Sequence, residues 1–103
     1  MQWQWLWNWS GLSFGYRDGD SLWTHDGRHV GQFVGDIVHG RDGRYLGEVR
    51  SGNRLITDRS RKSMSSGALG PYANRAPNAR KANSAPIAMN AGCEDFPSPE
   101  QLR

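Results

Sequence analysis

Three histidines, one cysteine and a short acidic loop are the groups in this chain that could bind a metal ion or act as a nucleophile. The histidines are His25, His29 and His39, and no cysteine accompanies them, because Cys93 stands far along the chain. A zinc site needs three or four converging ligands. The loop Asp18-Gly19-Asp20 lacks the regular acidic spacing and the closing glutamate of a calcium loop. We therefore expect no metal site and no cofactor.

No sequence pattern for covalent or acid–base catalysis accompanies these groups. Neither a Ser/His/Asp nor a Cys/His arrangement has a supporting local motif. The glycines recur in hairpin turns, so a spacing such as Gly27 to Gly31 is typical of turns and not of a phosphate-binding loop. The sequence predicts a protein that is not an enzyme and has no catalytic residues.

Aromatic residues are the other group that could bind a ligand, and they are concentrated near the N-terminus. Residues 2–9 alternate strictly, as in a β-strand, so four tryptophans share one face and residues such as Leu6 and Asn8 share the other. Such a face forms a wall of the core, a subunit interface, or an exposed platform for sugar rings or a protein partner. The candidate binding surface consists of Trp3, Trp5, Trp7, Trp9 and Trp23.

The element that must position these residues is a β-hairpin that the chain repeats every sixteen residues, with turn glycines at Gly11, Gly27 and Gly43. Each has an aliphatic residue five positions before it and an apolar residue three positions after it, followed by another glycine. Glycine inside a strand usually marks a bulge, a bend or a close approach by another group. A degenerate fourth copy begins at Leu55 and has Ser60 in place of the turn glycine. The repeated positions hold Leu6, Leu22 and Val38, then Phe14, Val30 and Leu46, then Gly15, Gly31 and Gly47.

The turn residues predict how the two strands of each hairpin pair. Asn or Thr at the first turn position and glycine at the last are typical of a type I turn closed by a left-handed glycine. In that register Leu6 pairs with Phe14, and equivalent pairs recur in the next two copies. The alternative, a two-residue Asp-Gly turn, would place Gly31 opposite Leu22. We favour the first because it pairs apolar residues with each other, and we expect these residues to form one buried cluster with Leu55.

The opening WNWSG at residues 7–11 and the later units HDGRHVGQF and RDGRYLGEV resemble the bacterial family of four-fold β-flower proteins. The resemblance covers residues 3–62. It implies an all-β fold of four antiparallel β-hairpin repeats around a pseudo-four-fold axis, often followed by a basic, proline-rich tail, and it implies no biochemical activity. The fourth copy departs from the family pattern, because its return strand at residues 61–64 lacks the apolar-Gly pair.

The repeat pattern ends near residue 63, where the composition changes. Residues 72–92 are rich in Ala, Asn, Arg, Lys, Pro and Ser, and they hold no aromatic residue after Tyr72. Such a segment buries too little apolar surface to offset its ordering entropy. We therefore predict a β-hairpin repeat domain over residues 1–65 and a disordered basic tail over residues 66–103.

Charge and cysteine content limit the function further. Six arginines against seven carboxylates leave residues 1–58 with a charge of −1, and seven bases against three carboxylates leave residues 59–103 with +4. The basicity therefore belongs to the tail. The single cysteine permits no internal disulfide, and no apolar run is long enough for a membrane span. No secretory signal begins the sequence, so we expect a cytoplasmic protein.

These observations predict a small non-enzymatic binding or scaffold module that acts through an unknown protein partner or through self-association. Two alternatives stay open: carbohydrate binding through exposed tryptophans, and weak nucleic-acid binding through the basic tail. The tail gives only weak support for nucleic-acid binding, because its seven basic residues are spread out and no aromatic residues alternate with them. For the apolar residues near the end of the tail, residues 96–102, we favour an unstructured end over the alternative of a short docking motif.

Overall fold

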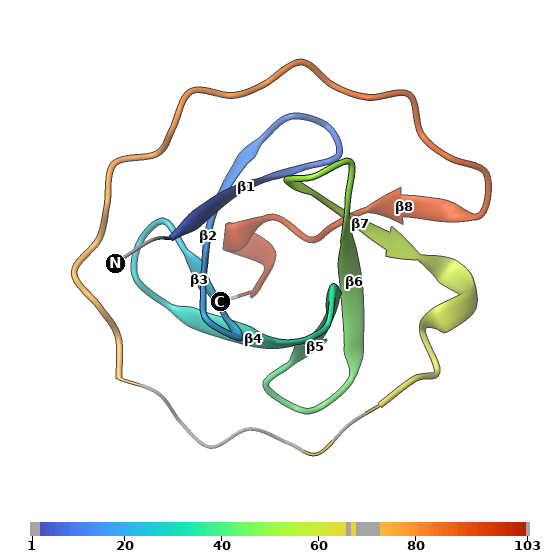
Figure 1. Ribbon diagram of the computed structural model, residues 1–103, viewed down its shortest axis with the longest axis horizontal. Coiled ribbons are helices and arrows are strands. Elements are labelled where there is room, and N and C mark those ends of the chain that lie inside the picture. The colour runs from blue at the N-terminus through green and yellow to red at the C-terminus, as the bar shows by residue number, and fades with distance from the viewer. Residues whose placement is uncertain (1–2, 66, 68–72, 103) are drawn as a thin grey trace.

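Eight short strands form one sheet in the computed structural model of the chain, which describes residues 3–65, 67 and 73–102, and the first seven of them close into a ring (Figure 1). Each strand pairs with the next one in the sequence, and β1 also pairs in parallel with β7, which closes the ring. The described residues form no α-helix, so the chain is all-β as predicted. No helix in this part of the chain is long and apolar enough to cross a membrane. The elements are β1 (Gln4–Asn8), β2 (Ser13–Asp18), β3 (Ser21–Thr24), β4 (His29–Val34), β5 (Ile37–Gly40), β6 (Tyr45–Arg50), β7 (Arg54–Asp58), the 3₁₀ turn η1 (Arg59–Arg61), β8 (Cys93–Asp95) and the 3₁₀ turn η2 (Pro99–Leu102).

The hairpin turns form where the glycine spacing predicted them. In the first turn the Gly11 N–H donates to the Asn8 carbonyl at 2.9 Å, and Gly11 adopts a φ of 96°. The N–H groups of Gly27 and Gly43 close the second and third turns in the same way, at 3.0 and 2.9 Å. The prediction of a type I turn that ends in a left-handed glycine is confirmed in all three hairpins.

The pairing of the strands differs from the predicted register by one residue. Leu6 lies opposite Gly15 and Trp7 opposite Ser13, so Phe14 is a bulged residue between two pairs. The same shift recurs in the second and third hairpins. The predicted pair of Leu6 with Phe14 is therefore wrong, as are its two equivalents. The physical reason is that the bulge at Phe14 lets the side chains of Leu6 and Phe14 both enter the core, instead of facing each other as a pair across the two strands.

A glycine follows each bulged residue because the neighbouring strand passes directly against it. A Cβ on Gly15 would overlap the carbonyl oxygen of Trp23 in β3, and a Cβ on Gly31 would lie 2.7 Å from the carbonyl oxygen of His39 in β5. Gly47 meets the backbone of β7 in the same way. These glycines therefore mark a close approach by another strand, one of the three roles expected for glycine inside a strand.

The inner side chains of the strands form one core along the axis of the ring. Of the side chains predicted for this cluster, all are buried in it except Leu46, which is half-buried and packs against it. Phe33 and Phe96 were not predicted, and Phe96 packs edge-on against Phe14 with 5.3 Å between the ring centroids. Burial of this apolar surface stabilises strands that are too short to be stable alone. The buried members are Leu6, Phe14, Leu22, Val30, Phe33, Val38, Leu55 and Phe96.

The strand that pairs with the last half of β7 comes from the C-terminal part of the chain. Cys93 lies opposite Asp58 and Asp95 opposite Ile56, and Phe96, just after β8, is 2% exposed. Further on, η2 packs its last residue against the core. The predicted disordered tail over residues 66–103 is therefore wrong for residues 93–102, whereas residues 66, 68–72 and 103 of that tail lie outside the described residues.

Ser60 explains why no return strand follows β7 directly. A serine there does not provide the left-handed turn, and the Asp58 side chain instead accepts a hydrogen bond from the Ser60 N–H and caps η1. The chain leaves the ring and comes back at Gly92, which has a φ of 77° and whose carbonyl accepts from the Arg59 N–H at 3.0 Å. A left-handed glycine thus precedes β8 as one precedes the other return strands.

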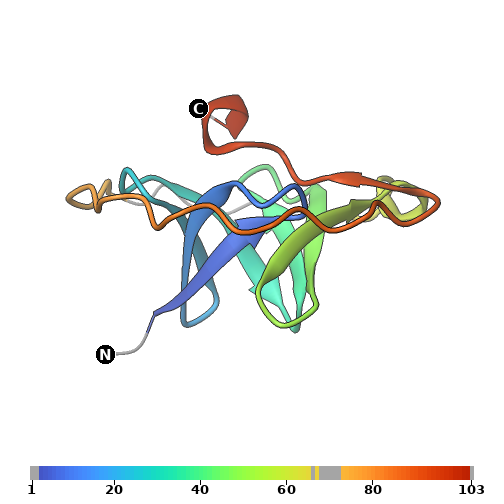
Figure 2. The ribbon, with the colours of Figure 1, turned by 90° about the horizontal axis from the view of Figure 1, so that it is seen from above.

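Before β8 the chain surrounds the ring as a belt, a name that we use for residues 73–92. Figure 1 shows the belt outside the strands. Figure 2 shows that the belt stays close to one plane, near the end of the ring that lies opposite the N-terminus. It contains neither strand nor helix, and most of its side chains are exposed. Its order must therefore come from its contacts with the ring and not from a core of its own.

Candidate functional site

The tryptophans of β1 lie on the outer face of the ring, opposite the inner residues Leu6 and Asn8. Leu6 belongs to the core, and the Asn8 amide donates to the Phe96 carbonyl at 2.8 Å inside the ring. The five predicted binding-surface residues lie at different depths. Trp9 and Trp23 are buried, whereas Trp3, Trp5 and Trp7 are half-buried.

The belt is hydrogen-bonded to the indole groups of this face. The Trp7 Nε1–H donates to the Ala82 carbonyl at 2.8 Å, and the Trp9 Nε1–H donates to the Ala88 carbonyl at 3.0 Å. An indole has a single donor, so in both residues it is used within the chain.

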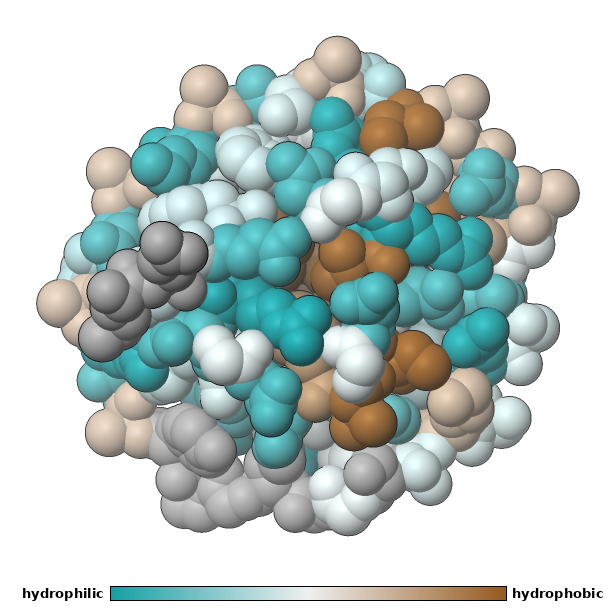
Figure 3. Space-filling view, in the orientation of Figure 1, coloured by the Kyte–Doolittle hydropathy of each residue, from teal (hydrophilic) through white to brown (hydrophobic). Residues whose placement is uncertain are grey.

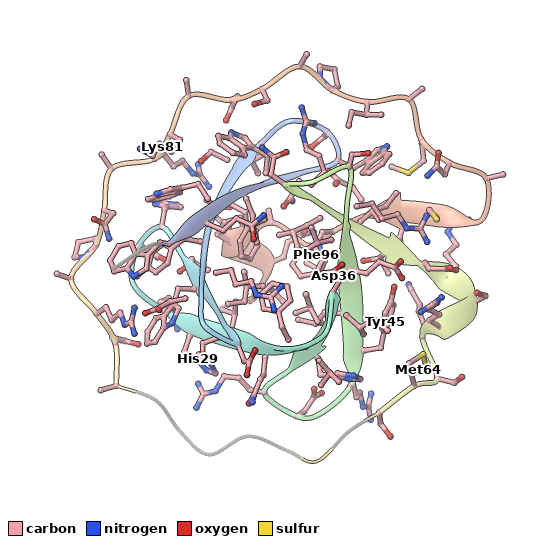
Figure 4. The ribbon with its side chains drawn as sticks, in the orientation of Figure 1. His29, Asp36, Tyr45, Met64, Lys81 and Phe96 are labelled. Atoms are coloured by element: carbon pink, nitrogen blue, oxygen red, sulfur yellow. The ribbon has the colours of Figure 1, made fainter. Side chains whose placement is uncertain are left out.

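Two cations of the belt lie on the ring faces of the tryptophans. The Arg75 guanidinium is 3.9 Å from the centroid of Trp23 and forms an ion pair with Asp18 at 2.8 Å. The Lys81 ammonium is 5.2 Å from the centroid of Trp5 (Figure 4). Cation–π contacts of this kind stabilise by about 0.5–2 kcal/mol each. The aromatic face is therefore covered by the chain's own belt.

A cleft opens beside Leu46, an inner side chain that is half-buried. It has a volume of about 500 Å³ and lies between β6, the end of β7, β8 and η2. Figure 3 shows hydrophobic residues near the centre of the viewed face and below it, with hydrophilic residues beside them. The apolar lining consists of Leu46, Pro97 and Leu102, and the polar and charged lining includes Arg44, Lys62, Glu94 and Gln101.

Tyr45 forms a wall of this cleft and links it to a charged network (Figure 4). Its hydroxyl donates to Glu48 Oε1 at 2.9 Å and accepts from the Asp58 N–H at 3.0 Å. The Arg50 Nε–H donates to the other oxygen of Glu48, also at 2.9 Å. Burial, together with the neighbouring Glu48, raises the pKa of Tyr45 to about 12. The hydroxyl therefore stays protonated near neutral pH and holds β6 to β7.

The three histidines occupy separate positions in the ring. His29 packs edge-on against Trp23 with 5.2 Å between the ring centroids, and it is buried. His39 is also buried, with Nδ1 3.2 Å from the Gly43 carbonyl oxygen, and His25 is half-buried. Within residues 3–65, 67 and 73–102, no three metal-ligating side chains form a group that could hold an ion.

The buried His29 should make stability depend on pH. Burial, reinforced by the nearby charges of Arg41 and Arg75, holds the pKa of His29 below its ordinary value of 6.5. The unfolded chain therefore binds the proton at a higher pH than the folded chain does. The contribution of His29 to the stability of the folded chain is complete above pH 6.5, and it is lost as the pH falls from 6.5 toward the folded-state pKa of His29.

Urea denaturation at about pH 7.5 and about pH 5.5 checks this expectation, and the free energy of unfolding should be lower at the lower pH. In His29→Gln the difference between the two pH values should shrink, whereas His25→Gln should keep it. A difference that is unchanged in His29→Gln would show that another group is responsible.

The sequence match to a known family covers most of the chain. The model of a family described as 4-fold beta flower protein matches residues 2–93. The chain belongs to this family. No curated protein and no solved structure matches it. The resemblance inferred from residues 3–62 is thus confirmed, and the match to the 4-fold beta flower family extends through the belt to the first residue of β8.

Sequence reasoning missed two parts of this 4-fold beta flower protein, namely the belt and Phe96. The belt had a signal in the sequence, because residues 73–77 and 82–86 share the pattern Ala-Asn-x-Ala-Pro. Phe96 had no local signal, because its partners in the core are distant in the sequence. Of the predicted surface, the structure brings Trp3 and Trp5 together on Tyr16, with centroid distances of 4.1 and 5.4 Å.

Proposed function

We propose that this 4-fold beta flower protein is a small non-enzymatic binding module and that the cleft beside Leu46 is its ligand site. The observation that carries the proposal is an apolar floor and a charged edge in one cleft of about 500 Å³. Ligand sites are typically concave and apolar, with a few polar groups that orient the ligand. The corresponding inner residues Phe14, Val30 and Phe96 are buried, so the core is open to a ligand at Leu46.

The cleft fits a compact ligand with an apolar body and an anionic or polar edge. The apolar body would lie on Leu46 and Leu102. The Arg44 side chain is 81% exposed and meets Asp42 at 3.8 Å, a surface pair that costs little to exchange for an anion on the ligand. Lys62 contributes less, because it already forms an ion pair with Glu94.

Titration with 8-anilinonaphthalene-1-sulfonate, which joins aromatic rings to a sulfonate, tests this site. The native chain should give a saturable rise in dye fluorescence. Gln101→Trp, which fills the cleft from an exposed position, should abolish it. Arg44→Ala should weaken binding by about tenfold, the loss of one modest charge-assisted contact. The matched control is Arg28→Ala, which changes the equivalent position of the second hairpin and should leave dye binding unchanged.

Two results would contradict the proposal. If Gln101→Trp is folded by circular dichroism and still binds the dye like the native chain, the cleft is not the site. If Arg44→Ala and Arg28→Ala weaken binding equally, the anion is not held at the edge of the cleft.

The predicted carbohydrate and nucleic-acid functions stay predictions, and the described contacts bear on both. A sugar would stack on indole faces, and those of Trp5 and Trp23 already carry cations of the belt. In the tail, the cations Arg75 and Arg80 pair with carboxylates at 2.8 Å, which lowers the charge available to a phosphate backbone. Titration with soluble glycans, and with single-stranded DNA at low salt, would test them.

We also infer that β7 and β8 are the fourth hairpin of the flower, interrupted by the belt. Leu55 in β7 and Phe96 after β8 join the core as Leu6 and Phe14 of the first hairpin do. The pairing of β7 with β8 is antiparallel, as in the other hairpins. The support for four-fold symmetry is therefore this shared placement together with the family description.

A further inference from the structure

The belt contains a repeat of its own, with a period of nine residues. Residues 73–79 read ANRAPNA and residues 82–88 read ANSAPIA, so five of the seven positions are identical. The shared pattern is Ala-Asn-x-Ala-Pro-x-Ala. A period of nine matches no repeat of the hairpins, so its cause must be sought in what each copy contacts.

The first copy lies on the turn of the second hairpin. The Arg75 N–H donates to the Gly27 carbonyl at 2.7 Å, and the Asn78 N–H donates to the His25 carbonyl, also at 2.7 Å. These bonds use one backbone group on each side of the proline, which has no N–H of its own.

The second copy lies on the turn of the first hairpin in the same register. The Ser84 N–H donates to the Gly11 carbonyl at 2.8 Å, and the Ile87 N–H donates to the Trp9 carbonyl at 3.1 Å. The donors are nine residues further along the belt, and the acceptors are sixteen residues earlier in the ring. Two copies of one peptide sequence are therefore bound by two copies of one turn.

The turn glycines provide the seat for the peptide. A Cβ on Gly27 would overlap the carbonyl oxygen of Arg75, and a Cβ on Gly11 would overlap that of Ser84. The left-handed glycine thus serves the turn and also admits the peptide backbone. In the second copy the Asn83 side chain adds a contact, because its Oδ1 accepts from the Ser13 N–H at 3.0 Å.

The shared residues of the peptide suit this mode of binding. Proline fixes its own φ and favours an extended conformation in the residue before it, so less entropy is lost on binding. Recognition of an extended backbone through main-chain hydrogen bonds is a common way for a domain to bind a peptide.

We propose that the turn rim of each of these two hairpins is a binding site for an extended peptide of the sequence Ala-Asn-x-Ala-Pro-x-Ala. The belt occupies both sites within the chain, and a segment with the same pattern on another protein binds there when the belt is displaced. This site is separate from the cleft, which lies on β6 and β8, so either proposal can fail without the other.

The test uses a full chain in which residues 73–91 are replaced by a Gly/Ser linker of the same length, so that β8 and Phe96 stay in place. A fluorescent synthetic peptide of residues 73–90 is titrated and followed by anisotropy. We expect saturable micromolar binding to this variant, and binding to the native chain that is at least about tenfold weaker because its belt occupies the rim. A peptide of the same composition in scrambled order is the control.

A folded linker variant that does not bind the peptide, or that binds the scrambled peptide equally well, would overturn the proposal. Amide hydrogen exchange in the native chain provides a second measurement that needs no variant. The amides of Arg75, Asn78, Ser84 and Ile87 should be protected relative to those of Ala76 and Ala85, which lie outside this bonding pattern. Equal exchange at all of these amides would also overturn the proposal.

Discussion

Replacement of Phe96 by alanine should lower the free energy of unfolding by about 3–5 kcal/mol, the usual cost of removing a buried phenylalanine ring. The Phe96 side chain is 2% exposed and packs against Phe14 in the core. Truncation to alanine would leave a cavity in the core, because the closely packed strands cannot move inward to fill the space of the lost side chain. Urea denaturation followed by tryptophan fluorescence would measure the loss, and thermal unfolding would show a correspondingly lower melting temperature.

The matched control for Phe96→Ala is Ile87→Ala in the belt. Ile87 is also apolar and C-terminal, but its side chain is 36% exposed, so its removal should change the free energy of unfolding by no more than about 0.5 kcal/mol. A chain that ends at residue 90 lacks β8 and Phe96 and should fail to fold. If Phe96→Ala instead melts like the native chain, the residues after the belt are not part of the core.

Replacement of Gly15 by alanine should destabilise the ring by about 3 kcal/mol or more, at the upper end of the cost of overpacking. The added Cβ would overlap the Trp23 carbonyl oxygen and also approach the Thr24 backbone. Both neighbours are main-chain atoms of β3, so the strand itself would have to move. The same denaturation experiment measures the effect, and dispersion of the amide NMR signals would show whether β2 and β3 separate.

The effects of such substitutions should follow the space that each glycine has. Gly31→Ala should lower the free energy of unfolding less than Gly15→Ala. The added Cβ would lie 2.7 Å from its nearest atom, a less severe overlap than at Gly15, and one of its other neighbours is a valine methyl group, which can move more easily than a main chain. Gly67→Ala is the control, since nothing lies within 4 Å of its added Cβ. Equal effects at Gly15 and Gly67 would show that the close approach of the strands is not what requires glycine.

The hairpins could be predicted from the sequence because their determinants are local. A left-handed glycine, a polar residue at the start of the turn and apolar residues at fixed offsets all lie within a few positions of each other, as around Gly27. The register could not be predicted fully. The bulge at Phe14 arises because several hairpins pack their side chains into one core. The pairing rules for two isolated strands do not describe that packing.

The C-terminal part could not be predicted for a different reason. Composition indicated that residues 72–92 bury too little apolar surface to be ordered, and most side chains of the described residues 73–92 are indeed exposed. Order comes instead from main-chain bonds to turn carbonyls such as that of Gly11, and from indole donors such as that of Trp7. Hydropathy does not register such bonds. β8 has only three residues, too few for a periodic signal.

For the candidate site, the sequence placed the tryptophans on one strand face but could not show what covers it. The belt passes over that face, so a surface predicted from Trp5 and Trp7 is occupied within the chain. The cleft had no signal at all, because Arg44, Leu46, Glu94 and Leu102 come from distant segments. Only the folded chain brings them to one place.

The hydrogen bond from the Asn8 amide to the Phe96 carbonyl has a consequence for the speed of folding. It joins positions 88 residues apart in the chain. The hairpins need only short loops and can form within microseconds, whereas a contact of such long range requires a much larger loop to close. Proteins with many distant contacts fold slowly. The rate at which this flower folds should therefore be set by the return of its last strand, and not by the formation of the repeated hairpins.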